Sequence, residues 1–215
     1  MPPNAQRPLQ VYKLHKLLTY GYPASFPLVW DIVLPPSLAS IRQCPPGSLS
    51  TGAVQRHLIP SSHSYGPPQP IPEQDLSHYA TTPPVRRMRI VSDLIPWSIT
   101  VRGQSTLPDD RDSFIRVVDV LYAIYHSLRI GVSEEEWNPT PKGFRNKVKK
   151  AHRARCHVSL AYTLNGYEKK QGLRRVDWFG EATVFMGLKT PDGEGRPVTV
   201  GVAEECTWVM VVWPH

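Results

Sequence analysis

The fold class follows from residues 88–128, MRIVSDLIPWSITVRGQSTLPDDRDSFIRVVDVLYAIYHSL. Met88–Val91 and Trp97–Val101 are rich in β-formers, and the second run alternates apolar and polar residues as a half-buried strand does. A helical spacing follows, with apolar residues at Phe114, Val117, Val118, Leu121, Ile124, Tyr125 and Leu128. We therefore predict two antiparallel strands and a helix that packs on them. The helix should begin near Asp112–Ser113, either of which is a suitable N-cap.

The rest of the chain supplies shorter elements on both sides of this stretch. A short helical spacing covers Val11–Tyr20, and a second long helix is predicted over Lys142–Arg155. Strands are predicted over Phe26–Leu34, Arg174–Phe179, Thr183–Lys189, Val198–Val202 and Thr207–Trp213. The predicted fold class is α+β, an antiparallel sheet with two or three helices packed on one face. We expect residues 1–215 to form a single domain.

Proline divides the chain, because residues 35–84 hold eleven of its 23 prolines. Proline removes a backbone donor and restricts the residue before it, so this composition favours loop or polyproline II structure. We therefore predict that residues 35–84 form a long irregular insertion. A ligand for a proline-binding adaptor domain is the functional alternative, but a surface spacer is the commoner role of such sequences.

Positive charge is concentrated in residues 142–175, the predicted basic helix and the loop that follows it. Eleven of the 25 Lys and Arg lie there against one acid, Glu168, which gives a local charge of +10 and leaves −3 for the rest of a chain of net charge +7. A localised field can select an anionic partner. The anion-binding candidates are Lys142, Arg145, Lys147, Lys149, Lys150, Arg153, Arg155, Arg174 and Arg175.

Two classes of partner suit these cations, an acidic protein surface and a nucleic acid. Nucleic acid is supported by the number of cations and by Tyr162 and Tyr167 as stacking candidates. No known nucleic-acid-reading motif is present, however, and a solvated helix face without a partner is the ordinary explanation of such a charge run.

Three acids inside apolar segments, Asp31, Asp119 and Asp177, are the catalytic candidates. An ionised carboxylate is costly to bury unless it is paired, so such acids suit acid–base chemistry or a structural ion pair. The structural alternative is favoured by nearby cations, Arg116 for Asp119 and Arg174–Arg175 for Asp177, and by a backbone partner near Pro35 for Asp31. Trp30, Trp97 and Trp178 are candidates for the walls of a ligand pocket, although core packing is the default for aromatic residues in strands.

Metal, cofactor and nucleophile sites have little support in the sequence. His152 and Cys156 are spaced for one face of a helix, but two ligands do not complete a metal site. Neither a phosphate-binding loop nor a base for Cys156 is evident, so we expect no metal and no cofactor. Three scattered cysteines and an N-terminus without a secretory pattern predict a cytoplasmic or nuclear protein, and the lack of a long apolar run predicts no membrane span.

A series of short motifs carries a family resemblance. The motifs are Leu14-His15-x-Leu17-Leu18, Leu28-Val29-Trp30-Asp31 leading to Pro35-Pro36, Ala80–Pro84, Ile95–Val101, Val118–Leu121, Arg174–Asp177 and Phe185-x-Gly187-Leu188. Together they resemble a family of unknown function, DUF6699, found mainly in mushroom-forming fungi. The resemblance implies a fungal origin and a single-domain organisation, and it implies no reaction.

The sequence leaves two functions from different classes. The first is an intracellular, non-catalytic binding or interaction module that uses the basic helix for an acidic partner. The alternative is a small-molecule enzyme or ligand carrier with a Trp-lined pocket and a buried Asp. Whether the protein is an enzyme, and its oligomeric state, are not decided by the sequence.

Overall fold

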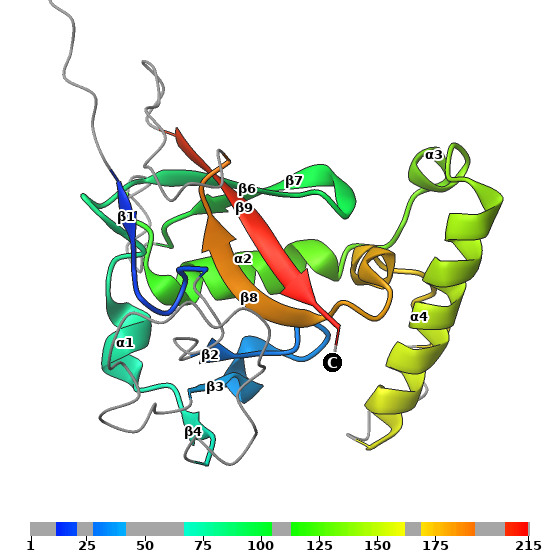
Figure 1. Cartoon of the computed structure of the whole chain (residues 1–215), viewed down its shortest axis with the longest axis horizontal. Helices are drawn as coiled ribbons and strands as arrows, with labels where there is room; N and C mark the ends of the chain where they lie inside the picture. Colours follow the sequence, from blue (N-terminus) through cyan, green and yellow to red (C-terminus); the bar gives the residue numbers. More distant parts are fainter. Residues whose placement is uncertain are drawn as a thin grey trace, which may run out of the picture.

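The core of the structure is a four-stranded sheet in the order β7-β6-β9-β8 (Figure 1). The structure is a computed structural model and describes residues 12–20, 28–41, 67–104, 113–161, 169–191 and 205–214. Strands β6 (Arg87–Ser92) and β7 (Ile95–Arg102) form an antiparallel hairpin, as predicted. Strands β8 (Val184–Lys189) and β9 (Glu205–Trp213) are also antiparallel. Strand β9 lies parallel to β6, which joins the two hairpins into one sheet.

Helix α2 (Val117–Leu128) covers one face of this sheet and confirms the α+β class. Its inward residues Val117, Val120, Leu121, Ile124 and Leu128 are all fully buried. The facing residues come from alternate positions of the strands, Met88 and Ile90 in β6 and Ile99 and Val101 in β7. The two periodicities in the sequence, 2 for a strand and 3.6 for a helix, therefore meet in one core.

The prediction that this helix begins near Asp112–Ser113 is wrong. Helix α2 begins at Val117, and Asp119 caps it by accepting a hydrogen bond from the Arg116 backbone N–H at 2.8 Å. Residues just before it are extended, because Ile115 bonds to the backbone of both Val85 and Ala80. Long-range pairing thus outcompetes the helical preference of the preceding residues. Asp112 itself lies outside the described residues.

Two further predictions of local structure are wrong. The segment Val11–Tyr20 is not helical in its described part but holds strand β1 (Lys13–Leu14), which pairs with β5 (Thr81–Thr82). Its helical spacing comes from a turn that buries Leu17 and Leu18. Arg174–Phe179 is not a strand but the 3-10 helix η4 (Arg175–Phe179), which buries four consecutive residues.

Residues 28–41 and 67–82 contain more structure than the proline content predicts. Strand β2 (Leu28–Val29) is only the start of the predicted strand Phe26–Leu34, and it pairs with β3 (Ser40–Ile41), which pairs with β4 (Gln69–Pro70). The 3-10 helix η2 (Pro36–Leu38) and helix α1 (Glu73–Ser77) flank them. The prediction of an irregular insertion is therefore wrong at both ends of residues 35–84. Residues 42–66 lie outside the described residues, as does the predicted strand Val198–Val202.

Helices α3 (Glu134–Trp137) and α4 (Lys142–Ala161) follow α2. Helix α4 begins where predicted and is longer than the predicted Lys142–Arg155. It stands beside the sheet and packs on η4 rather than on the strands (Figure 1). Its inward residue Val148 is fully buried, as its apolar stripe predicts. Within the described residues, no helix is both long enough and apolar enough to cross a membrane.

The close contact between the N-terminal segment and β8 depends on Gly187. Its φ is +112°, and a Cβ built there would lie 2.6 Å from the backbone N of Tyr20. Two backbone bonds hold this contact, Leu188 N–H to Leu18 O at 2.7 Å and Tyr20 N–H to Leu188 O at 2.8 Å. We predict that Gly187→Ala lowers the free energy of unfolding by about 1–3 kcal/mol from backbone strain alone. Urea unfolding followed by Trp fluorescence measures the change.

Gly143→Ala is the matched control. Gly143 lies in the first turn of α4, where an added Cβ meets nothing within 4 Å. This substitution should raise the free energy of unfolding by about 0.5–1 kcal/mol, because alanine loses less backbone entropy in a helix. Equal effects of the two substitutions would contradict the role of Gly187.

Candidate functional site

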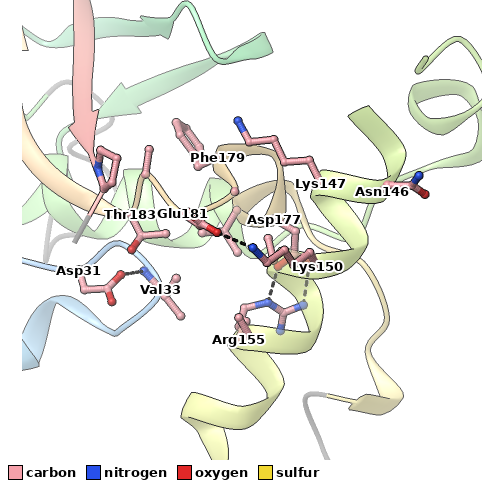
Figure 2. Close-up of a pocket in the computed structure, with 16 residues that line it drawn as sticks. Asp31, Val33, Asn146, Lys147, Lys150, Arg155, Asp177, Phe179, Glu181 and Thr183 are labelled. Carbon is pink, nitrogen blue, oxygen red and sulfur yellow. Dashed lines mark hydrogen bonds and ion pairs between the residues drawn. The ribbon is translucent and has the colours of Figure 1, made fainter. Parts of the chain in front are cut away.

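The structure contains a pocket of about 820 Å³ between α4, η4 and the turn that follows β2 (Figure 2). Helix α4 supplies one wall, and residues 176–183 supply the opposite wall. The lining residues that matter for its chemistry are Asp31, Lys147, Lys150, Arg155, Asp177, Glu181 and Thr183. Its volume is within the usual range for a small-molecule site, roughly 300–1,000 Å³.

A buried ion pair between Arg155 of α4 and Asp177 of η4 forms one side of this pocket. Arg155 donates from Nε to Oδ1 at 2.8 Å and from a terminal nitrogen to Oδ2 at 3.0 Å. Both side chains are 1% exposed. Two parallel hydrogen bonds to a planar guanidinium are the strongest form of this interaction, and they fix the orientation of both groups.

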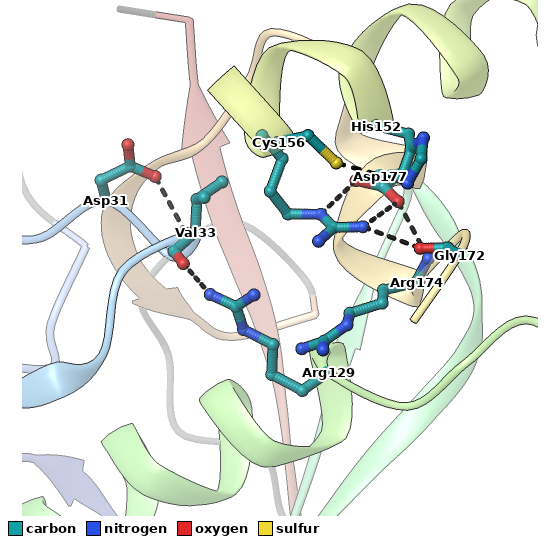
Figure 3. A network of polar contacts seen from close by, with 9 residues as sticks. Asp31, Val33, Arg129, His152, Cys156, Gly172, Arg174 and Asp177 are labelled. Carbon is teal, nitrogen blue, oxygen red and sulfur yellow. Dashed lines mark hydrogen bonds and ion pairs between the residues drawn. The ribbon is translucent and has the colours of Figure 1, made fainter. Parts of the chain in front are cut away.

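The Asp177 carboxylate accepts a further hydrogen bond, from the backbone, in addition to those from Arg155 (Figure 3). Its Oδ2 accepts a hydrogen bond from the Arg174 backbone N–H at 2.9 Å, which caps η4. Arg155 donates a further bond to the Gly172 carbonyl at 3.0 Å. The sequence pointed to Arg174–Arg175 as partners of Asp177. Arg174 is a partner through its backbone N–H, Arg175 pairs instead with Glu136 at 2.6 Å, and the ion pair with Arg155 was not predicted.

Asp31 lies on another wall of the same pocket. Its carboxylate accepts a hydrogen bond from the Val33 backbone N–H at 2.9 Å, and the residue forms an isolated bridge with Val184 of β8. The Val33 carbonyl in turn accepts a hydrogen bond from Arg129 at the end of α2 (Figure 3). Asp31 and Asp177 thus share a pocket, whereas Asp119 caps α2 and does not line it. All three carboxylates accept bonds that shape the backbone, so each has a structural role.

The three tryptophans predicted as pocket walls do not line this pocket. Trp30 is buried in the core, packs against Phe185 with tilted rings, and donates from Nε1 to the Leu34 carbonyl at 2.9 Å. Trp97 and Trp178 pack edge to face at 5.4 Å between ring centroids. Both belong to an aromatic cluster that joins the start of α4 to the sheet.

This aromatic cluster consists of Trp97, Trp137, Phe144 and Trp178. Trp178 lies at its centre and contacts the other three rings. Cations lie over its outer rings, with Arg175 4.7 Å from the Trp97 centroid and Arg145 5.2 Å from that of Trp137. Arg145 also donates to the carbonyls of residues 138 and 140. Arg145 therefore ties the start of α4 to α3 and the turn after it, and Arg175 ties η4 to β7 and, through Glu136, to α3.

The predicted anion-binding residues separate into two groups. Four are occupied in the structure: Arg155 and Arg174 are buried, and Arg145 and Arg175 make the contacts described above. The other five are exposed and all lie on α4: Lys142, Lys147, Lys149, Lys150 and Arg153. We call these five residues the α4 cation face.

One described acid neutralises part of the α4 cation face. Lys150 Nζ lies 2.7 Å from Glu181 Oε1, and both side chains are exposed. Their hydrogen bond raises the pKa of Lys150 and lowers the pKa of Glu181, so both groups are charged over a wider range of pH. Glu181 and Thr183 were missed by sequence reasoning, because they come next to the site only through the packing of η4 on α4.

The two described cysteines, Cys156 and Cys206, are both free and buried. Cys156 is buried, with its Sγ 3.5 Å from His152 Nε2. Burial raises the pKa of Cys206 to about 11, so its thiol is protonated at neutral pH. His152 and Cys156 gain no third potential metal ligand from the part of the chain that the structure describes.

Comparison with known families gives one match. The model of a family of unknown function, DUF6699, matches residues 28–196. The chain belongs to this family. The DUF6699 match covers β2 to β8 and every lining residue of the pocket except Pro214. Comparisons with curated proteins and with solved structures found no match.

The Arg155–Asp177 pair generates a stability prediction for this DUF6699 protein. Asp177→Ala leaves a buried guanidinium without its partner, and loss of one member of a buried pair costs about 3–5 kcal/mol. We expect the free energy of unfolding to fall by that amount in a urea titration. Glu181→Ala, which removes the exposed partner of Lys150, is the control and should leave the midpoint nearly unchanged. A midpoint of Asp177→Ala equal to that of wild type would show that the pair does not hold α4.

Proposed function

We propose that this DUF6699 protein is a non-catalytic binding module whose α4 cation face binds an acidic segment of a partner protein. The observation that carries the proposal is the distribution of charge on α4. Five exposed cations lie on one helix, and Glu181 is the one described acid in an ion pair with them. The other predicted anion-binding residues are already buried or engaged in contacts within the fold: Arg145, Arg155, Arg174 and Arg175.

The spacing of the cations supports an extended acidic partner. Lys142, Lys149 and Arg153 are seven and four residues apart, which places them along one side of the helix. From first to last they span about 16 Å at 1.5 Å per residue. An acidic helix or strand lying along α4 would meet all three.

The fixed position of α4 also supports this role. Arg155 anchors its middle to η4, and Phe144 and Arg145 anchor its start to the aromatic cluster. A surface held rigid before binding loses less conformational entropy when a partner arrives. A cation face on such a helix presents its charges in a fixed order.

A protein partner is favoured over a nucleic acid because the described side chains of α4 include no exposed Phe, Tyr or Trp. Single-stranded nucleic acids are bound by aromatic side chains on which bases stack. Among the described residues, the exposed large apolar side chains are Leu38, Tyr79, Leu94, Phe114, Ile130 and Trp213, and none of them lies on α4. Tyr162 and Tyr167 lie outside the described residues.

Charge reversal tests this proposal. The triple variant Lys142→Glu, Lys149→Glu, Arg153→Glu should weaken binding of a fluorescent polyglutamate peptide by about tenfold or more, because each exposed ion pair contributes about 0.2–1 kcal/mol and reversal replaces attraction by repulsion. Fluorescence anisotropy at low salt measures the affinity, which should also fall as salt is added.

A control with the same change of charge is available elsewhere. Lys13, Arg89 and Arg102 are exposed on strands, and their reversal to Glu should leave peptide binding nearly unchanged apart from the effect of net charge. Equal loss in the two triple variants would show that net charge, and not the α4 cation face, controls binding. Tighter binding of an RNA oligonucleotide than of the peptide would favour the nucleic-acid alternative.

The pocket supports a second candidate, a small-molecule carrier or enzyme that uses Asp31. Its volume suits a small ligand, and Asp31 lies on its wall together with Lys147 and Lys150. Ala154, which lines the pocket from α4, offers a way to fill it. The alternative therefore rests on Asp31 and on cations rather than on tryptophan.

Native mass spectrometry of the protein from its own source tests this candidate. A retained small molecule should be lost in Ala154→Trp, because the larger side chain occupies the pocket, and in Asp31→Asn, which keeps an oxygen for Val33 N–H but removes the charge. The exposed α2 residue His126 serves as the control position, and His126→Ala should retain the molecule. A ligand that persists in Ala154→Trp would place it elsewhere.

We further infer a fungal, cytoplasmic or nuclear setting for this function. The support is the resemblance of the short motifs to a largely fungal family and the state of the thiols. Cys156 and Cys206 are both free and buried, which suits a reducing compartment.

A further inference from the structure

Strand β1 and helix α1 lie at the end of the molecule away from α4 (Figure 1). A second cluster of polar side chains lies between these two elements. It consists of His15, Asp75 and His78. One nitrogen or oxygen from each of these residues lies within 4.8 Å of the others. Asp75 lies within α1, His78 is the residue that caps its C-terminal end, and His15 follows β1 directly. Sequence reasoning missed this cluster, because His15 is far along the chain from Asp75 and His78, which lie within the Pro-rich residues 35–84.

We propose that His15, Asp75 and His78 bind a divalent transition-metal ion of the zinc type. Two imidazoles and one carboxylate are a ligand set that proteins use for such ions, and three protein ligands leave a coordination position for water or a further group. The proposal concerns a site apart from the α4 cation face and does not depend on the proposed function.

The backbone around the cluster fixes where these side chains start. Strand β1 pairs with β5, and the His15 N–H donates to the Ala80 carbonyl at 2.9 Å. Ala80 lies two residues after His78, so this backbone hydrogen bond brings His15 close to His78. Helix α1 carries Asp75, and His78 follows as its C-cap three residues later, with Nδ1 3.8 Å from Asp75 Oδ1.

The side-chain geometry is close to that of a bound ion. His78 Nδ1 lies 3.8 Å from Asp75 Oδ1, and the two imidazole centroids are 5.5 Å apart. Zinc bonds of about 2.0–2.2 Å place tetrahedral ligand atoms about 3.3–3.6 Å apart. Small rotations of partly exposed side chains would close the remaining gap. His15 Nδ1 accepts a long bond from the Leu17 N–H at 3.4 Å, which leaves Nε2 available.

Lys16 is the residue that opposes metal binding. Its Nζ lies 3.4 Å from Asp75 Oδ1, the same oxygen that faces His78. The Lys16 side chain is 68% exposed, so it can leave the carboxylate without unfolding the segment. A metal ion would then replace the ammonium as the cation that Asp75 holds. Removal of the Lys16 side chain should therefore strengthen metal binding and change the free energy of unfolding little.

The experiment is a titration of the metal-free full chain with Zn²⁺ by isothermal calorimetry. We expect saturable binding of one ion, and at least about tenfold weaker binding in His15→Ala, Asp75→Asn and His78→Ala, since even loss of a group behind a ligand costs about 10–100-fold. Lys16→Ala should bind about fivefold more tightly, because a competing charge is removed. His126→Ala, which removes an exposed histidine of α2, should bind as wild type does.

The variants also separate metal binding from folding. Asp75→Asn keeps the size of the side chain, and His78 and Lys16 are at least half exposed, so these variants should keep the wild-type circular dichroism spectrum. Zn²⁺ should raise the melting temperature of wild type and of Lys16→Ala, but not that of His78→Ala. The proposal is overturned if wild type shows no saturable binding, if the three ligand variants bind as wild type does, or if Lys16→Ala binds more weakly.

Discussion

The buried pair between Arg155 and Asp177 is the interaction on which the position of α4 depends. It joins a helix that otherwise has little contact with the sheet to η4, a turn of helix packed in the core. Asp177 also caps η4, so one carboxylate fixes both the local conformation and the long-range contact. Desolvation offsets much of the attraction in a pair this deeply buried, but loss of one partner would leave an unpaired charge in the core. The pair therefore favours one position of α4 over alternatives more than it adds to the net stability.

Fixing α4 in this way has two consequences. The inward side of the helix and η4 enclose a pocket, and the outward side presents its cations to solvent. Basic residues of the same helix thus have two different roles, one structural and one at the surface. Arg155 and Arg145 hold the helix in place, whereas Lys142, Lys149 and Arg153 remain available to an anion. Total charge would not distinguish these roles, because burial and hydrogen-bond partners decide which cations a ligand can reach.

The opposite end of the molecule shows that a proline-rich segment can contain short strands and helices. Its two ends form β3, β4, α1 and β5, and β5 pairs with β1. This pairing brings His15 to the end of α1. Proline limits helix and strand length, but it does not prevent short elements that gain stability from pairing with other segments.

Local periodicity determined the main elements of this protein from sequence. The hairpin of β6 and β7, the helix through Leu128, the start of α4 and the strands β8 and β9 all follow from spacings of 2 and 3.6, because each buries one face of its own segment. The sequence also located the positive charge. Tertiary structure alone decided that β9 lies parallel to β6, that Arg174–Phe179 turns into a 3-10 helix, that Arg155 is the partner of Asp177, and that His15 meets Asp75 and His78. These outcomes depend on contacts between residues far apart in the chain, and such contacts leave no periodic signal in either partner.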